Sequence, residues 1–445
     1  MKPTVSHPYL PTTDAQRQEM LGSIGADTVQ DLFQDIPSRF RSPSLQLPTA
    51  LSELELRQEL EALGSANAVA GEYISFLGGG AYRHFIPAVV RAMVSRGELL
   101  TSYTPYQPEV SQGTLQATYD FQTLICLLTG MDVANAGMYD GATALAEAAL
   151  MSCRVTGRNS VRALATVNPR YLDVVQTYCA PQGITVNVIS PDAAVIGPED
   201  SCLLVQYPNF LGGIESMEGL ADSVHASGGL LVASVNPLAL GLLKPPGDFG
   251  VDIVTGECQP LGIPLSFGGP YVGLFTCREE HVRQMPGRVV GRTQDKSGKH
   301  GFVLTLQTRE QHIRRAHATS NICTSEALIA TASAVYLAAL GPIGLQQVAA
   351  LCYHKAHYTA SLIERISGYS VILPSHKNWF HEFVIRGPGT PADLNKRLFN
   401  RGILGGINVS KLVPNGLLLC VTEMKSRKEI EALAQALAEI ALELQ

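Results

Sequence analysis

The chain has 445 residues, of which 46% are hydrophobic and 16% charged, and its formal net charge is -6 at pH 7. This length accommodates two or three domains with a large core, and the negative charge disfavours a broad electrostatic attraction to nucleic acid. No run of 18 or more apolar residues occurs, and the first twenty residues lack the apolar stretch of a signal peptide. We therefore expect a cytoplasmic protein without a membrane span.

The nine cysteines are scattered along the chain, and none of them forms a C-x-x-C pair. Most of them lie inside apolar runs. This pattern predicts buried, reduced thiols rather than a secreted disulfide framework or a zinc site. We therefore expect no metal centre.

Residues 1–70 are predicted to form a helical N-terminal arm. Thr13 and Asp14 are expected to cap a first helix, and Asp27 is expected to cap a second one over TVQDLFQ. The run LSELELRQELEALGSAN (51–67) places leucines at helical spacing, which indicates an amphipathic helix. Such an arm either wraps a partner chain or packs on its own domain.

Residues 71–325 are predicted to form a large α/β domain. Short apolar runs alternate with helical stretches, and strands that are apolar on both faces indicate a parallel sheet covered on both sides. The run 268–277 is expected to close the sheet, with an antiparallel direction as one option. The predicted strands are 163–168, 185–190, 202–208, 229–235 and 251–256, and helices are predicted over 170–183 and 214–228.

Residues 326–445 are predicted to form a small C-terminal α+β domain. It is entered through an apolar helix that starts near residue 325. Thr390 is expected to cap a second helix that has Pro391 at its first position, and Ser426 with Glu429 forms a capping box for the last helix. The strands predicted between these helices are 369–374, 379–387 and 416–422.

Three longer segments, 103–150, 245–275 and 286–324, carry a recognisable pattern. Together they resemble the glycine decarboxylase family, the P-protein of the glycine cleavage system. The resemblance is to its N-terminal half or, where the enzyme is split into two chains, to its alpha-type subunit. It covers nearly the whole chain, and LQTREQHIRRAHATSNICT (306–324) is its most specific part. It implies the fold of pyridoxal-phosphate (PLP) dependent transferases, fold type I, as in aspartate aminotransferase.

An enzyme of this fold needs a donor-rich helix N-terminus for the PLP phosphate, an acid beside the pyridine nitrogen and a lysine for the imine. Thr143, in YDGATA before a helix, marks either a phosphate loop or an ordinary cap. Asn236 stands where the acid is expected, and a neutral amide cannot stabilise a pyridinium as a carboxylate does. Gln259 stands where the lysine is expected, and no lysine occurs between Lys244 and Lys296. These positions are therefore predicted to be vestigial, without covalent PLP.

The resemblance also implies partners. In two-chain enzymes of this family a beta subunit carries PLP, decarboxylates glycine with release of CO2, and passes the aminomethyl group to the lipoyl arm of H-protein. We expect this chain to complete the beta subunit's site, in an assembly of two alpha and two beta chains. One alternative is an autonomous PLP-dependent lyase or transaminase, against which the missing lysine argues. The other is a purely structural or regulatory paralogue.

Two groups of residues are expected to form a wall of the partner's active site, or the interface with it. The first lies in a loop whose prolines restrict the backbone, and the second lies in the most specific stretch. For the tyrosines, packing at an interface is an equal alternative. For Arg314 and Arg315 the alternative is a solvated face or salt bridges. For His312 a structural role is the favoured alternative. The residues are Tyr103, Tyr106, Glu109, Ser111, Gln112, Arg309, His312, Arg314, Arg315, Thr319, Ser320 and Asn321.

The glycines at 78–80 are compatible with a phosphate loop. However, no G-K-[ST] sequence follows them, so a tight backbone turn is the favoured interpretation. Tyr82, Arg83 and His84 come next and match the family's G-x-G-x-Y-x-H-x-x-P stretch. We expect them to lie near the entrance of the site.

Overall fold

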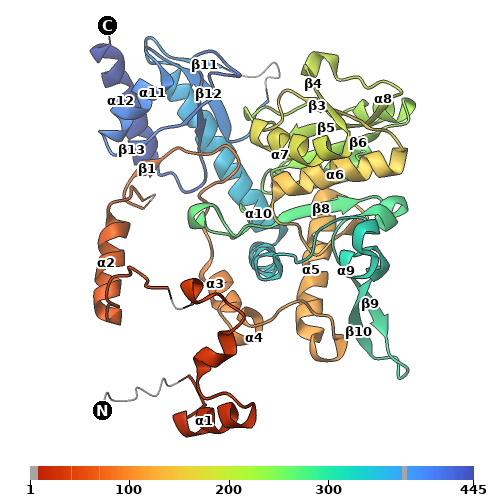
Figure 1. The fold of residues 1–445 in the computed structure, drawn as a ribbon. Helices are drawn as coiled ribbons and strands as arrows, with labels where there is room; N and C mark the ends of the chain where they lie inside the picture. Colours follow the sequence, from red (N-terminus) through yellow and green to blue (C-terminus); the bar gives the residue numbers. More distant parts are fainter. Residues whose placement is uncertain (1–8, 42, 70, 373–377, 445) are drawn as a thin grey trace. The chain divides into compact units, whose positions relative to one another are not determined.

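The structure, a computed structural model, describes residues 9–41, 43–69, 71–372 and 378–444 (Figure 1). It divides the chain into two compact units, Met1–Ala68 and Val69–Gln445. The smaller unit is helical, and the larger one carries both β-sheets of more than two strands that the described residues form.

The first unit contains two helices that the sequence predicted. Capping boxes begin both α1 (Asp14–Ser23), at Thr13, and α2 (Glu53–Ser65), at Ser52. The helix predicted over TVQDLFQ is wrong in type and in its cap, because the chain forms only a 3-10 helix, η1 (Val29–Phe33), which begins after Thr28. The leucines of α2 are exposed, so this helix has an apolar surface that its own unit does not cover.

The second unit is built on a seven-stranded sheet of β2 (Val133–Ala134), β3 (Ser160–Leu164), β4 (Thr185–Ile189), β5 (Asp200–Tyr207), β6 (Leu230–Val235), β7 (Ile253–Glu257) and β8 (Gly273–Cys277). Their order is β2-β8-β7-β6-β5-β3-β4. The strands from β4 to β7 in this order run parallel, and β8 and β2 close one edge in antiparallel directions. Four of the five predicted parallel strands and the antiparallel option for 268–277 are confirmed. The strand predicted over 163–168 lies earlier, as β3 at Ser160–Leu164, and the two-residue strand β2 was not predicted.

Helices cover this sheet as the alternating sequence pattern predicted. Figure 1 shows α6 (Gly141–Thr156) and α7 (Pro169–Cys179) on the near side of the sheet, and α6 packs against β5, β6, β7 and β8. α6 can approach the strands closely because small side chains such as those of Ala144, Ala148 and Ala149 are fully buried there. α5 (Gln112–Thr129) packs against β2 and β8, and α8 (Leu220–Ala226) packs against β6.

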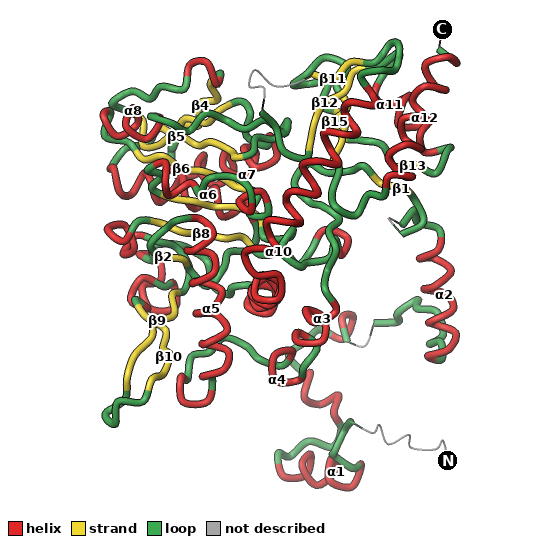
Figure 2. Tube along the Cα trace, turned by 180° about the vertical axis from the view of Figure 1, so that it is seen from behind, coloured by secondary structure: helices red, strands yellow, loops and turns green. Residues whose placement is uncertain are grey.

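A β-hairpin that the sequence analysis did not predict follows the sheet. It consists of β9 (Val289–Gln294) and β10 (His300–Thr305), and it projects away from the seven-stranded sheet (Figures 1 and 2). The Asp295 carboxylate accepts hydrogen bonds from the N–H groups of Ser297 and Lys299 and so closes the turn. The hairpin is tied back to the domain by Gln112, whose side chain bonds both the N–H and the C=O of Phe302.

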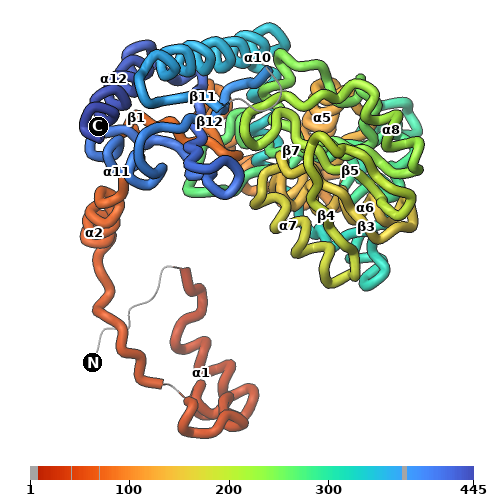
Figure 3. Tube along the Cα trace, turned by 90° about the horizontal axis from the view of Figure 1, so that it is seen from above, coloured from red at the N-terminus to blue at the C-terminus, as the bar shows by residue number. Residues whose placement is uncertain are grey.

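The long helix α10 (Ala327–Ile363) leads from the large sheet to the C-terminal sheet (Figures 2 and 3). It is longer than the sequence predicted, because the chain continues as a helix beyond a break at Gly341, before Pro342. It is long and apolar enough to cross a membrane by length and composition alone. However, Tyr336 and Cys352 are among its side chains that are buried in the protein's hydrophobic cores.

The C-terminal part forms a four-stranded antiparallel sheet in the order β11-β12-β15-β14, with strands β11 (Ser370–Ile372), β12 (Glu382–Arg386), β15 (Leu417–Cys420) and β14 (Ile407–Asn408). The caps predicted at Thr390 and Ser426 begin α11 (Pro391–Phe399) and α12 (Arg427–Glu443). The end of the strand predicted over 369–374 lies outside the described residues. β1 (Ile74–Ser75) pairs with β13 (Ile403–Leu404), so the chain passes through this part before it enters the large sheet. The boundaries at residues 70 and 325 stay a proposal.

Short helices complete the second unit. Among them are α3 (Ala88–Val94), α4 (Gly97–Leu100), η3 (Pro108–Val110), η10 (Gln307–Arg309), α9 (Gln311–Arg314) and η11 (Arg315–His317). They lie in the stretches before α5 and after β10, which are the two stretches that contain the predicted wall residues. Those residues are therefore held by loops and short helices rather than by the large sheet.

Candidate functional site

The carboxyl ends of the parallel strands meet at a small pocket, which is where ligands bind in sheets of this kind. The pocket has a volume of about 320 Å³. Its lining includes the ends of β5, β6 and β7 and the loop after the 78–80 glycines. The lining residues are Gly80, Tyr82, Asn168, Tyr171, Gln206, Ser234, Val235, Asn236, Glu257 and Pro260.

The helix N-terminus predicted to hold a phosphate is that of α6, and it lies beside this pocket. Asp140 is its N-cap, and the carboxylate of Asp140 accepts a hydrogen bond of 2.7 Å from the N–H of Thr143. The Thr143 hydroxyl donates back to Asp140, so it is used inside the cap. Of the two interpretations that the sequence left open for this stretch, the geometry matches a helix cap closed by the chain itself.

Glu257, at the end of β7, was not predicted to contribute to this helix. Its Oε2 accepts a hydrogen bond of 3.0 Å from the N–H of Gly141, the first residue of α6. Its Oε1 accepts one of 3.0 Å from the N–H of Gln259. Burial raises the pKa of Glu257 to about 8, and the two backbone N–H groups act in the opposite direction.

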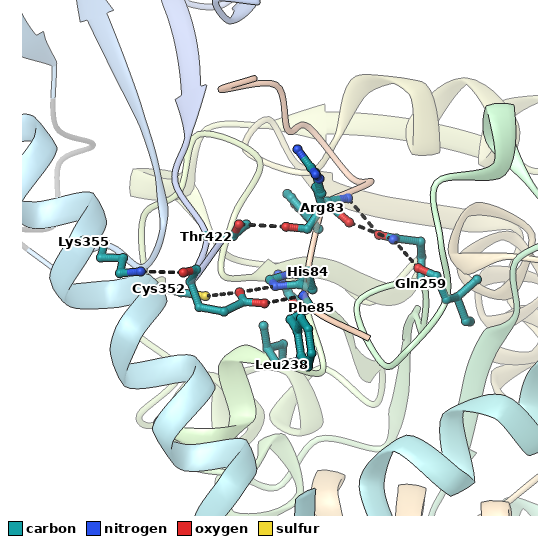
Figure 4. Close-up of polar contacts among 12 residues, drawn as sticks. Arg83, His84, Phe85, Leu238, Gln259, Cys352, Lys355 and Thr422 are labelled. Atoms are coloured by element: carbon teal, nitrogen blue, oxygen red, sulfur yellow. Dashed lines mark hydrogen bonds and ion pairs between the residues drawn. The ribbon is translucent and has the colours of Figure 1, made fainter. Parts of the chain in front are cut away.

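Gln259, at the position expected for lysine, is almost fully buried and joins two loops (Figure 4). Its Oε1 accepts a hydrogen bond of 2.8 Å from the N–H of Tyr82. Its Nε2 donates to the carbonyl oxygens of Tyr82 and Ile263, each at 2.8 Å. A side chain with three hydrogen bonds to backbone groups has a structural role at this position, and it supplies no amine.

Asn236 lies at the end of β6, at the position expected for the acid. Its Oδ1 accepts a hydrogen bond of 3.1 Å from the N–H of Leu238, two residues further along the chain. Its Nδ2 is buried beside the pocket without a hydrogen-bond partner. The amide therefore stabilises its own turn and offers the pocket a donor, where a pyridinium nitrogen would need an acceptor.

The residues at this site do not fit PLP. None of the described residues that line the pocket is a lysine. The N–H groups of Gly141 and Thr143 at the start of α6 are occupied by Glu257 and Asp140, so a phosphate at that place would have to displace both side chains. We therefore derive no chemical step through PLP on this chain.

The two predicted wall groups meet at Tyr106. The Tyr106 hydroxyl accepts a hydrogen bond of 3.0 Å from Arg288, and its ring lies edge-on to His312 with 5.6 Å between the ring centroids. Arg288 is buried and pairs with Glu310 at 3.2 Å, and His312 lies 3.5 Å from the same carboxylate. Sequence reasoning missed Arg288 and Glu310, although both lie inside the segment that carried the resemblance.

The predicted wall residues of the loop 103–112, called the tyrosine loop below, differ in accessibility. Tyr103 is 74% exposed and Tyr106 47% exposed, and Glu109 is also exposed. Ser111 precedes α5 without a side-chain capping bond. Gln112 is occupied by its bonds to Phe302 and to the carbonyl of Pro108. Of these predicted residues, Tyr103, Tyr106 and Glu109 are thus the exposed ones.

The second group surrounds a partly buried arginine, Arg309. Arg309 donates to the carbonyl oxygens of Leu306, Met285 and Gly287, so its role within this chain is structural. The Thr319 N–H donates to the Arg309 carbonyl, and Arg314 donates to the Thr308 carbonyl. The Ser320 hydroxyl donates to Glu147 at 2.9 Å. Arg315 and Asn321 are exposed.

A cationic recess of about 650 Å³ lies beside Arg309. It contains three arginines and one histidine and no acidic side chain, so it offers a positive surface to an anionic group. The lining residues are Arg283, Gln284, Leu306, Thr308, Arg309, Arg314, His317 and Thr319.

Arg83 and His84 lie at the junction between the large sheet, α10 and the C-terminal part (Figure 4). Tyr82 precedes them and bonds both Gln259 and Glu382. The His84 Nδ1 lies 2.7 Å from Oε2 of Glu423, and the Phe85 N–H donates to Oε1 of the same carboxylate at 2.6 Å. The Thr422 hydroxyl donates to the carbonyl of Arg83, and the Cys352 thiol lies 3.3 Å from Glu423. This segment therefore fastens the two parts of the second unit to each other.

His84, Cys352 and Glu423 are also residue types that bind metals, and their donor atoms lie within 4.8 Å of one another. Hydrogen bonds already join these atoms in pairs, and burial raises the pKa of the Cys352 thiol well above its ordinary value. Since a metal needs the thiolate, the arrangement favours a hydrogen-bonded junction.

The glycines at 78–80 form the predicted backbone turn. Gly79 has φ +79°, and a Cβ on Gly79 would lie 2.4 Å from Cδ1 of Ile407. The Gly79 N–H donates to Glu382 at 2.6 Å, and the Tyr82 hydroxyl donates to the other oxygen of that carboxyl at 2.8 Å. The Gly79 N–H is thus already occupied by a carboxyl group of the chain itself, which leaves it unavailable to a bound phosphate.

Comparisons with known proteins agree with this geometry. The family model described as glycine cleavage system P-protein matches residues 7–437. Relatives from Thermomicrobium roseum and Desulfitobacterium hafniense, each named probable glycine dehydrogenase (decarboxylating) subunit 1, are 50% and 49% identical. Each of the two matches covers 97% of this chain and 99% of the relative.

Solved structures give the same result. A crystal structure of glycine decarboxylase (P-protein) of the glycine cleavage system, in inhibitor-bound form, superimposes with a TM-score of 0.92 at 43% identity, over 98% of this chain and all of that one. An aspartate aminotransferase from Thermus thermophilus matches with a TM-score of 0.58 at 14% identity, over 84% of this chain and all of that one, and shows the fold alone. The predicted fold type I of PLP-dependent enzymes is confirmed. The chain belongs to the P-protein family of the glycine cleavage system.

Proposed function

We propose that this chain is the PLP-free alpha subunit of a two-subunit glycine decarboxylase. The observation that carries the proposal is the closed site at the carboxyl edge of the sheet, where Gln259 and Glu257 bond the chain's own backbone. A chain that keeps the complete fold but supplies neither an amine nor free phosphate donors is suited to completing a site on another chain.

In this proposal a beta subunit carries PLP. The complex of two alpha and two beta chains decarboxylates glycine in the cytoplasm, releases CO2, and passes the aminomethyl group to the lipoyl arm of H-protein. The relatives named subunit 1 support the existence of a second subunit. The alpha chain's own contribution is to bind the beta chain and to shape part of its site.

The tyrosine loop supports a contact with the partner's site. Arg288 holds the Tyr106 hydroxyl, and the buried pair of Arg288 with Glu310 fixes that arginine, so the phenol is oriented before a partner binds. Tyr103 and Glu109 are exposed beside it. A preorganised, half-exposed phenol suits an active-site wall, because reacting groups must be positioned closely.

The cationic recess beside Arg309 supports a related role for the second group. Arg283 and Arg314 are exposed at its margin, and His317 is exposed as well. Guanidinium groups bind carboxylates and phosphates with two parallel hydrogen bonds. We propose that this part of the chain lies at the interface with the partner and binds carboxylates or phosphates of the partner or its substrate. The residues concerned are Arg314, Arg315, Thr319, Ser320 and Asn321.

Tyr106→Phe tests the wall directly. The variant keeps the ring but loses the acceptor of Arg288, so the turnover of the alpha–beta complex in glycine–bicarbonate exchange should fall about tenfold, as expected for one lost hydrogen bond in a transition state. Glu109→Gln should lower turnover as well. Size-exclusion chromatography should show that both variants still assemble with the beta chain.

Tyr358→Phe is the matched control, since the Tyr358 hydroxyl makes one hydrogen bond, to Glu431, in the C-terminal part. It should leave turnover unchanged. If Tyr106→Phe and Glu109→Gln assemble normally and both keep full activity, the loop is not a wall of the active site. The alternative of a purely structural paralogue would then be favoured.

A further inference from the structure

The N-terminus of α6 is closed by two carboxyl groups of the chain itself. Asp140 takes the N–H of Thr143, at 2.7 Å, and Glu257 takes the N–H of Gly141, at 3.0 Å. These backbone groups have no partner within a helix, and together with the helix dipole they attract anions. Asp140 is an ordinary cap, whereas Glu257 comes from a different part of the sequence, 116 residues away.

The space at this helix end is filled as well. A Cβ on Gly141 would lie 2.8 Å from the Tyr171 hydroxyl and 2.9 Å from the Cβ of Glu257. Glu257 is 8% exposed, and Tyr171 and Glu257 both line the remaining pocket. Residue 141 must therefore be glycine, and no bound group can contact its N–H while the Glu257 side chain is present.

The carboxyl group of Glu257 bonds in the way that two oxygens of a bound phosphate do. One oxygen accepts the first N–H of the helix and the other accepts the N–H of Gln259, so both oxygens satisfy backbone donors. We propose that Glu257 is a built-in substitute for a bound phosphate, and that its removal opens a latent site for inorganic phosphate or a phosphate monoester at the start of α6.

The role rests on the shape of the side chain and on its two oxygens. The Glu257 carboxyl fills the space between Gly141 and Tyr171 and places one oxygen beside each N–H group. Gln259, two residues after Glu257, is fixed by hydrogen bonds to the backbone of Tyr82 and Ile263 (Figure 4). In the wild-type chain the N–H groups of Gly141 and Thr143 therefore already have acceptors from the chain itself. The inference stands or falls independently of any partner subunit.

Glu257→Ala tests the proposal in the full-length chain. The variant should unfold at a lower temperature than the wild type, and inorganic phosphate at constant ionic strength should raise its midpoint by about 2 °C or more once phosphate exceeds its dissociation constant tenfold. Equilibrium dialysis with radiolabelled phosphate should find one site more in the variant than in the wild type, so that phosphate held at the cationic recess counts equally in both.

Glu147→Ala is the matched control, because Glu147 is a buried carboxyl in the interior of the same helix, where no N–H group is free. It should gain no phosphate site. Binding of phosphate by the wild type at as many sites as Glu257→Ala would overturn the proposal, and so would a folded Glu257→Ala chain that binds none.

Glu257→Gln covers the case in which the alanine variant does not fold. The amide offers one acceptor oxygen to two N–H groups, so this variant should fold with a lower midpoint than the wild type and still exclude phosphate. A midpoint equal to that of the wild type would contradict the proposal, because a second acceptor oxygen would then have no role.

Discussion

Gln259→Lys is expected to destabilise the chain strongly and to form no imine with added PLP. The change removes three hydrogen bonds to the backbone of Tyr82 and Ile263 and places a charge at a position that is 1% exposed. Loss of these bonds and burial of an ammonium group should lower the free energy of unfolding by about 3–5 kcal/mol. Restoring the residue type that PLP enzymes use would therefore damage this chain, because Gln259 now joins two loops.

Denaturant unfolding measures the loss of stability. Borohydride reduction followed by mass spectrometry shows whether an imine with PLP has formed. Gln176→Lys, at an exposed position of α7, is the control and should change the free energy of unfolding by less than about 0.5 kcal/mol. A pyridoxyl adduct on the new lysine, in a chain as stable as the wild type, would show that the site is open to PLP.

Glu423→Ala should have a comparable effect at the junction of the second unit. The carboxylate accepts hydrogen bonds from His84 and from the N–H of Phe85, and it contacts the thiol of Cys352 (Figure 4). Its removal leaves these buried groups without an acceptor, so the free energy of unfolding should fall by about 3–5 kcal/mol. Glu431→Ala, which removes an exposed ion pair with Arg427 and an exposed hydrogen bond from Tyr358, should shift the unfolding midpoint little.

The same carboxylate predicts a pH dependence. Burial raises the pKa of Glu423, but the hydrogen bond and the charge of His84 outweigh burial and hold the pKa below its ordinary value of 4.5. A carboxyl with a lowered pKa in the folded state stabilises the fold above its unfolded pKa and loses this effect as the pH falls. The difference in stability between the wild type and Glu423→Ala should therefore shrink as the pH falls below about 4.5. A difference that is constant from pH 7 to pH 3 would contradict the role of the ionised carboxylate.

The large sheet could be predicted because its strands are buried on both faces. Continuous apolar runs such as 229–235 have no other stable place in a protein of this size, and the helices between them set the parallel direction. Helix starts could be predicted where a side chain caps its own helix, as at Thr13 and Ser426. These signals are local in the sequence, so no tertiary information was needed.

The vestigial site was predicted only in outline. The missing lysine and acid could be seen in the sequence, because they concern residue types at expected positions. The role of Glu257 could not, because it rests on a contact between residues 116 positions apart. The same holds for Glu382, whose side chain accepts a hydrogen bond from the N–H of Gly79 in a distant part of the sequence.

Elements whose stability comes from distant contacts were missed. The hairpin of β9 and β10 is half exposed and lacks a continuous apolar run, so its turn at Asp295 was its main signal. Phe267 has φ +55° and is fully exposed, a strained aromatic residue that composition cannot reveal. A non-glycine residue in this backbone region is strained, and no local sequence signal at Phe267 predicts it.

Reconstitution with the beta chain tests the central claim most directly. The full-length chain, the PLP-bearing beta chain and their mixture are each assayed for glycine–bicarbonate exchange in the presence of lipoylated H-protein. We predict no exchange by this chain alone with added PLP, and exchange by the mixture far above that of the beta chain alone. Exchange by this chain alone, or a beta chain whose activity is the same with and without it, would contradict the account.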